Sequence, residues 1–208
     1  DQNKQCPQMV TLADQEGDIT GWLLQACEYN IEFVVRGRCH RVVEELGELR
    51  NFVHSIQPAL SYKIEVPVKT SKKATRRLYM RTAKVEVRHV QLYFQGPNKK
   101  LYYSEEKPKN SLPIDLIYIS EKDVPEGMEG VEWSLLTNIA VKTKEDIKQR
   151  IEWYKLRWHI EGFHRVLKSG CTVEQCRLQE AQRLDRYLAL MSIIAWRIYW
   201  ATHLSRTM

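Results

Sequence analysis

The order of apolar and polar residues in the first forty positions predicts a strand, a helix and a second strand. Residues 9–14 form a short apolar run that ends in Asp14. Asp18 stands where a helix N-cap is expected, ahead of a helical apolar pattern from Ile19 to Ala26. Residues 31–37 are rich in β-branched residues, as in a buried strand. This order is typical of a parallel α/β sheet and places Asp14 at the carboxyl end of its strand, where such sheets bind ligands.

The middle of the chain changes to an alternation of polar and apolar residues. Residues 43–56 carry a weak helical pattern that ends before Pro58. Antiparallel strands are predicted after it, at residues 62–70, 76–94, 112–124 and 131–141. Between the first two strands lies a dense basic segment, residues 69–77, which includes Lys72, Lys73 and Arg76. Its cations favour either a solvated loop or a contact with a nucleic-acid backbone.

Helical periodicity returns near Thr143, which forms a predicted capping pair with Asp146. The predicted helix runs to about Lys168 and ends at Ser169-Gly170, and a second helix covers residues 180–203. We therefore predict an α/β core that is interrupted by a β-rich antiparallel insertion. The predicted division is residues 1–42 for the first part of the core, 43–141 for the insertion and 142–208 for the C-terminal helices.

The first of these helices carries one unusual face. Tyr154, Arg157, Glu161 and Lys168 fall within about 60° of one another at helical spacing, and Arg165 joins them. A carboxylate held between cations stays ionised at neutral pH, so it suits a hard metal ion while the cations bind phosphates. The alternative is a solvated helix, because Arg157–Glu161 and Glu161–Arg165 are ordinary i,i+4 pairs.

Composition narrows the class of partner. The 208 residues have a net charge of +6 and a pI near 9.0, which favours an anionic partner such as nucleic acid. No apolar run approaches the ~18 residues of a membrane span, and no signal peptide is recognised. The odd number of cysteines, five, argues against a disulfide framework and fits a reducing cytoplasm.

The spacing Tyr-x2-Arg-x3-Glu-x6-Lys over residues 154–168 resembles the signature of bacterial DDE cut-and-paste transposases of the insertion-sequence-four group. The sequence ADQEGDI around Asp14 resembles the surroundings of that family's second catalytic aspartate. FVVRGRCHR, which contains Arg36, resembles the following strand, and EWSLLT, which contains Trp133, resembles the segment whose tryptophan stacks on a flipped base. The resemblance covers nearly the whole chain.

This resemblance implies an RNase H-like core and a site that cleaves transposon ends and joins them to target DNA. Asp14 and Glu161 would be catalytic metal ligands, and three carboxylates in the complete site would hold two Mg²⁺ or Mn²⁺ ions. The residues expected to contact DNA are Arg36, Trp133, Tyr154, Arg157, Arg165 and Lys168. Trp133 should then be partly exposed, although a strand tryptophan is usually a packing residue, and Tyr154 could equally be a residue at the edge of the core.

Further expectations concern the protein as a whole. The family's first catalytic aspartate lies far upstream of the second, whereas only thirteen residues precede Asp14. We therefore expect a fragment of a longer enzyme, inactive by itself and incomplete at the N-terminal side of its core. The expected partners are double-stranded DNA and a second subunit, in the bacterial cytoplasm at the nucleoid. The alternative functions are a truncated or degenerate DNA-binding product without catalysis, another RNase H-like nuclease, or a structural scaffold.

Overall fold

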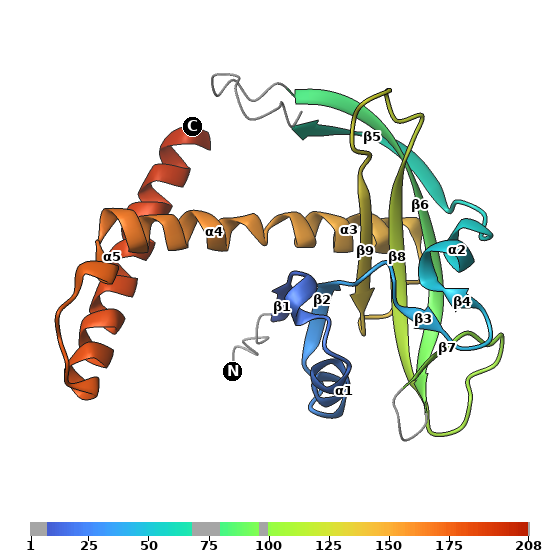
Figure 1. Cartoon of the computed structure of the whole chain (residues 1–208), viewed down its shortest axis with the longest axis horizontal. Coiled ribbons are helices and arrows are strands. Elements are labelled where there is room, and N and C mark those ends of the chain that lie inside the picture. Colours follow the sequence, from blue (N-terminus) through green and yellow to red (C-terminus); the bar gives the residue numbers. More distant parts are fainter. Residues whose placement is uncertain (1–7, 68–79, 96–99, 208) are drawn as a thin grey trace, which may run out of the picture. The chain divides into compact units, whose positions relative to one another are not determined.

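The structure is a computed structural model that describes residues 8–67, 80–95 and 100–207 (Figure 1). The chain divides after Tyr154 into two compact units, which we call the sheet unit and the helical unit. The strands are β1 (Val10–Ala13), β2 (Glu32–Arg36), β3 (Val42–Val43), β4 (Gly47–Glu48), β5 (Leu60–Pro67), β6 (Met80–Gln95), β7 (Lys100–Tyr102), β8 (Leu112–Lys122) and β9 (Glu132–Thr137). The α-helices are α1 (Thr20–Glu28), α2 (Leu49–His54), α3 (Lys144–Lys155), α4 (Trp158–Arg165) and α5 (Ala181–Thr207).

One mixed sheet forms the centre of the sheet unit, so the predicted α/β class is confirmed. Its strand order is β1-β2-β9-β8-β6-β7-β3-β4, and β5 pairs with the other part of the long strand β6. Strands β1 and β2 are parallel, as the strand–helix–strand pattern predicted, with Ala13 opposite Val35. Strand β9 is antiparallel to β2 and β8 is antiparallel to β9. The strands expected in the insertion therefore extend the same sheet that contains β1 and β2.

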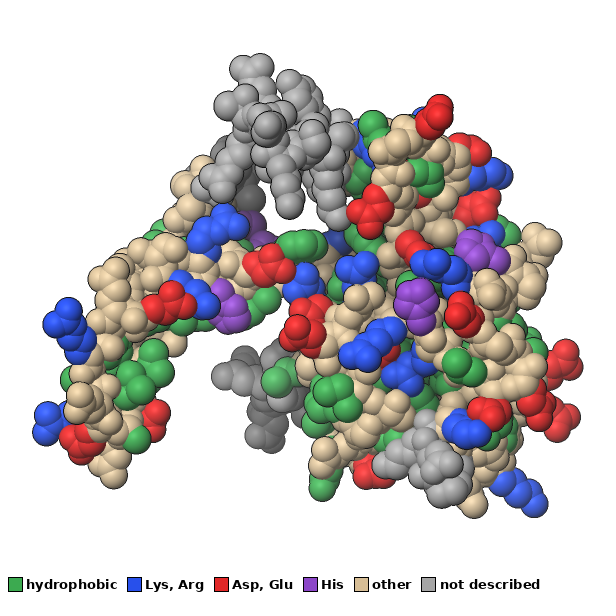
Figure 2. Space-filling model, viewed as in Figure 1, with side chains coloured by type: hydrophobic (Ala, Val, Ile, Leu, Met, Phe, Trp, Pro, Cys, Tyr) green, Lys and Arg blue, Asp and Glu red, His purple; other side chains and the backbone are tan. Residues whose placement is uncertain are grey.

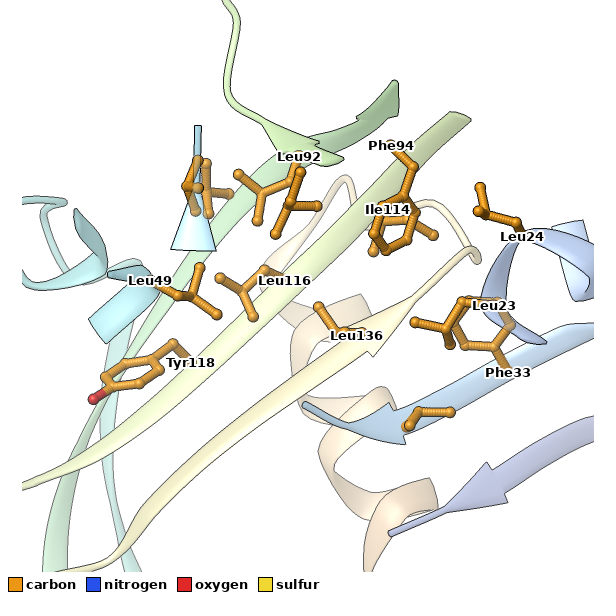
Figure 3. Close-up of a cluster of buried hydrophobic side chains, with 14 of the residues drawn as sticks. Leu23, Leu24, Phe33, Leu49, Leu92, Phe94, Ile114, Leu116, Tyr118 and Leu136 are labelled. Atoms are coloured by element: carbon orange, nitrogen blue, oxygen red, sulfur yellow. The ribbon is translucent and has the colours of Figure 1, made fainter. Parts of the chain in front are cut away.

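Apolar side chains cover both faces of this sheet. On one face, Leu23 and Leu24 from α1 and Leu49 from α2 pack on strand residues such as Leu116 and Leu136 (Figure 3). On the opposite face, α3 packs through Ile147, Ile151 and Tyr154 against residues of β2, β6, β8 and β9. Because successive strand residues point to opposite faces, each central strand contributes to both cores. We call these the α1/α2 face and the α3 face.

The helix predicted over residues 43–56 is shorter than expected. Val42–Val43 form strand β3, and α2 begins only at Leu49. Gly47 between them has φ = +82°, a left-handed conformation that interrupts a helix and that glycine adopts without steric cost. The β-branched valines then pair in the sheet, with Val43 opposite Leu101 of β7.

The predicted helix N-cap at Asp18 is wrong. The N-cap residue is Ile19, and no side chain caps the helix there. Asp18 is instead buried, where its Oδ2 accepts a hydrogen bond from the Arg38 backbone N–H at 2.8 Å and its carboxylate pairs with the Arg41 guanidinium. A buried carboxylate needs such partners, and this one ties α1 to the loop after β2.

The predicted capping pair at Thr143 is confirmed, but the helix that it begins is interrupted. The Asp146 N–H donates to Thr143 Oγ1 at 3.1 Å, and the Thr143 N–H donates to Asp146 Oδ2 at 2.8 Å. Helix α3 then ends at Lys155, and α4 begins at Trp158. A π-helical turn, η2 (Val166–Gly170), follows α4.

The helical unit consists of α4, η2, a short 3₁₀ turn η3 (Val173–Gln175) and α5. Helices α4 and α5 approach closely at Gly162, where a Cβ atom would lie 2.6 Å from Cε2 of Tyr199. His159 Nδ1 is hydrogen-bonded to the Tyr199 hydroxyl beside this contact. In the part of the chain that the structure describes, no helix is long and apolar enough to cross a membrane.

Replacing Asp18 with Asn should destabilise the sheet unit by about 3 kcal/mol, because Arg41 would lose the carboxylate that compensates its charge. The exposed Glu28 offers a control, and its replacement by Gln should change stability by less than about 0.5 kcal/mol. Urea unfolding of both variants provides the comparison. Equal effects would show that the Asp18–Arg41 pair contributes nothing specific.

Candidate metal and nucleic-acid site

Asp14 and Arg36 lie at the carboxyl ends of two paired parallel strands. Ala13 is opposite Val35. Asp14 directly follows Ala13, and Arg36 directly follows Val35. Leu12 and Val34, two positions earlier, contribute to the core on the α3 face. Asp14 is extended, with φ = −82° and ψ = −166°, so the strand alternation continues and assigns both side chains to that face.

The carboxylate of Asp14 is exposed and locally oriented. Its Oδ1 accepts the Glu16 backbone N–H at 3.0 Å, which makes Asp14 the N-cap of the 3₁₀ turn η1 (Gln15–Gly17). One carboxylate oxygen thus has an N–H donor, while the group stays accessible to solvent. Carboxylate oxygens are the ligands that Mg²⁺ and Mn²⁺ prefer, so this residue fits the expected metal chemistry.

Trp133 lies at the same end and on the same face of the sheet. Arg36 is opposite Leu135 of β9, and Trp133 comes two residues before Leu135 on the same face. Arg36 Nη2 donates to the Glu132 carbonyl oxygen at 3.4 Å, while its buried Nε makes no hydrogen bond to any described residue. Trp133 is partly exposed, as predicted, and one side of it packs against the core under α3.

Tyr154 reaches this cluster from the end of α3. Its ring centroid lies 6.2 Å from that of Trp133 in an edge-to-face arrangement. Tyr154 is only 4% exposed, which favours the alternative that it is a residue at the edge of the core. The fold therefore brings Asp14, Arg36, Trp133 and Tyr154 to one end of one face, although up to 140 positions separate them in the sequence.

The remaining predicted residues belong to the helical unit. Glu161 is in the first turn of α4, 46% of its side chain is exposed, and its Oε1 accepts a hydrogen bond from Arg157 Nη2 at 3.0 Å. Arg165 is exposed, and Lys168 pairs at 3.0 Å with Glu174, which is also exposed. Exposed ion pairs of this kind contribute little to stability. Because Asp14 and Glu161 belong to different units, their proximity stays a prediction.

The residues Lys72, Lys73 and Arg76 lie outside the described part of the chain, so their predicted contact with DNA stays a prediction. Other basic side chains follow β2 in the described part of the chain. Arg38 and His40 are exposed in the loop that follows β2. Figure 2 shows Lys, Arg and His side chains gathered over the middle of the sheet unit on the face that it presents.

Sequence reasoning missed a polar network around Glu132, the residue before Trp133. Arg50 Nε donates to Glu132 Oε1 at 2.7 Å, and the Tyr118 hydroxyl donates to the same oxygen. Burial raises the pKa of the Glu132 carboxyl, but the hydrogen bonds from Tyr118 and Arg50 outweigh it, so the pKa lies below its usual range. Burial and the neighbouring carboxylate raise the pKa of Tyr118 far above its usual value. The alternation Glu132–Trp133 in the sequence signalled opposite faces but not these partners.

Trp158 is a second residue that the sequence analysis did not single out. It is 60% exposed at the start of α4, and the guanidinium carbon of Arg157 lies 4.8 Å from its ring centroid. Arg157 lies over one face of this ring, so the contact is a cation–π interaction within the helical unit. A signal was present, because Trp158 falls within the signature run and directly follows Arg157.

The chain was compared with models of known protein families, and no family model matches it.

The lowered pKa of Glu132 predicts a pH dependence of stability. A carboxyl whose pKa is lower in the folded state contributes stability above its unfolded pKa of about 4.3, and this contribution is lost as the pH falls through the folded value. Glu132→Gln should therefore lose less stability than the wild type between about pH 6 and pH 3. Urea midpoints measured across this range test it, with Glu28→Gln as the control. Parallel pH profiles for Glu132→Gln and the wild type would contradict the assignment.

Proposed function

We propose that this chain is part of a DNA transposase of the DDE type, with an RNase H-like core, which cuts and joins DNA by metal-dependent phosphoryl transfer. The observation that supports this most is the gathering of Asp14, Arg36 and Trp133 at one end of one sheet face. An exposed acid, a partly exposed cation and a partly exposed aromatic ring are the groups needed to hold a metal ion, a phosphate and an unpaired base.

Asp14 and Glu161 would hold Mg²⁺ or Mn²⁺ through their carboxylate oxygens. The bound ions would activate a water or a 3′-hydroxyl and stabilise the leaving oxygen. Asp14 is oriented for this by the N–H of Glu16, and Glu161 is held by Arg157. The third acid of the complete two-ion site is expected from a part of the protein outside this sequence, so catalysis is proposed for the longer protein.

The cations around these acids would bind DNA. The Arg36 side chain is partly exposed at the end of β2, whereas Arg165 and Lys168 are exposed on the helical unit. Contacts of this kind with phosphates fix the position of a duplex without reading its sequence. For a transposase of this type, the proposed partners are the transposon ends, the target duplex and a second subunit, in the cytoplasm of a bacterium.

A second candidate is a DNA-binding product that does not cut DNA. The partly exposed pair Arg157–Glu161 favours it, because a glutamate engaged by an arginine needs no metal ion. The two candidates predict the same DNA contacts and differ in metal binding. Metal titration of the acidic residues therefore discriminates between them.

We expect the chain to bind Mn²⁺ weakly and, by itself, to join no DNA ends, because two carboxylates do not hold the pair of ions that in-line displacement requires. Asp14→Asn and Glu161→Gln should each weaken Mn²⁺ binding by at least about tenfold, since each removes one charged ligand. Electron paramagnetic resonance of free Mn²⁺ measures this, with Glu28→Gln as the control. Unchanged binding in both variants would support the second candidate.

Trp133→Ala should weaken binding to DNA that carries an unpaired base by about 5- to 150-fold, which corresponds to about 1–3 kcal/mol of base stacking. Trp133→Phe should retain most of the affinity because the ring is kept. Fluorescence anisotropy with matched duplexes, with and without the unpaired base, provides the measurement. Tyr29, which is 69% exposed at the C-terminal end of α1, supplies the control variant Tyr29→Ala. Equal losses for Trp133→Ala and Tyr29→Ala would exclude stacking at Trp133.

A further inference from the structure

Three lysines lie side by side across three neighbouring strands of the sheet unit. Lys63 of β5 is directly opposite Lys84 of β6, and Lys84 is directly opposite Lys122 of β8. Directly opposite residues share a face, so the three side chains form one row, which we call the lysine row. All three are exposed. With strands about 4.8 Å apart, the row places three positive charges within about 10 Å.

The charges of this row are only partly compensated. Lys122 Nζ lies 3.1 Å from Glu86 Oε1, but Glu86 also pairs with Arg88. Neither Lys63 nor Lys84 forms an ion pair with any residue in the described ranges. Glu65 of β5, on the same strand as Lys63, accepts a hydrogen bond from Thr82 at 2.7 Å. Two directly opposite like-charge contacts in succession destabilise a sheet, so the row has a cost that folding does not explain.

Protection of a sheet edge does not account for Lys84. Lysines on edge strands prevent unwanted pairing with other chains, and β5 pairs only with β6 among the described strands. Lys84, however, lies on β6 and is paired on both sides, with β5 and with β8. A lysine there does not guard an edge, yet it takes part in both like-charge contacts.

We propose that the lysine row binds the phosphate backbone of duplex DNA, a conclusion that rests on the proposed function for the identity of the partner. Duplex DNA carries about one negative charge per 1.7 Å with both strands counted, so about 10 Å of one strand carries about three phosphate charges, as many as the row has lysines. The row occupies the α1/α2 face, on which Leu92 and Phe94 of β6 also lie, whereas Asp14 and Trp133 belong to the α3 face. The row is therefore a second DNA contact, separate from the proposed catalytic site.

The test compares salt dependence and stability in the same variants. The triple variant Lys63→Gln, Lys84→Gln, Lys122→Gln should lower the slope of log K against log[salt] for a fluorescent duplex by about 2–3, since each phosphate contact contributes about 0.9. Its Kd at about 0.1 M salt should rise at least tenfold. Lys84→Gln alone relieves both like-charge contacts, so its Tm should rise by about 2 °C. Weaker DNA binding from a more stable protein is a result that a merely structural role does not produce.

A matched triple variant in other exposed lysines, Lys107→Gln, Lys109→Gln and Lys144→Gln, removes the same net charge elsewhere. It should change the salt slope by less than about 1. Equal slopes for the two triple variants would overturn the lysine row as a binding surface and leave the proposed function standing. If the wild type has no affinity for duplex DNA at low salt, both proposals fail. If the wild type binds duplex DNA but Trp133→Ala does not weaken binding to DNA with an unpaired base, the proposed site around Trp133 is contradicted and the lysine row still stands.

Discussion

The pairing of β9 with β2 is the constraint on which the rest of the sheet unit depends. Val34 is opposite Thr137 and Val35 is opposite Leu136, and about a hundred residues separate the two strands. Side chains at the end of β9 reinforce the pairing. Thr137 Oγ1 donates to the Phe33 carbonyl oxygen at 2.6 Å, and the Asn138 amide accepts from the Phe33 N–H at 3.0 Å. Through this pairing the long antiparallel strands are fixed in register with β1 and β2, and Trp133 reaches the end of the sheet where Asp14 and Arg36 lie.

The alternation along β9 allows one short strand to serve two purposes. Trp133 and Leu135 face α3, while Glu132, Ser134 and Leu136 belong to the opposite face. The carboxylate of Glu132 is bound by Arg50 from α2 and by Tyr118 from β8, so the start of β9 is held from behind the tryptophan. A partly exposed aromatic ring is useful for stacking only if its backbone is fixed, since ordering it on binding would cost entropy. The network on one face thus supports the proposed site on the other.

The sequence predicted those features that depend on local periodicity. It did not predict side-chain interactions between residues that are far apart in the sequence. The parallel pair β1–β2 and the Thr143–Asp146 cap follow from residues that are close in sequence or repeat at a regular spacing. Asp18 was misassigned because its partner Arg41 is 23 positions away, and an isolated acid before a helix resembles an N-cap. The helix predicted over residues 43–56 was too long because a weak helical pattern does not reveal Gly47 as a left-handed residue. The Glu132 network was missed for the same reason as Asp18, because α2, β8 and β9 meet only in the fold.

The interruption between α3 and α4 divides the signature helix in a way that bears on the proposed chemistry. Tyr154 ends the sheet unit as a buried residue, and Arg157 and Glu161 begin the helical unit as a partly exposed pair. The two proposed metal ligands therefore come from different units, and each is already oriented within its own unit, Asp14 by Glu16 and Glu161 by Arg157. A ligand that binds only when both units are correctly placed stabilises that arrangement by RT ln(1 + [L]/Kd), where [L] is the free ligand concentration. Under the proposed function, an ion shared by Asp14 and Glu161 would thus couple the two units as well as supply chemistry.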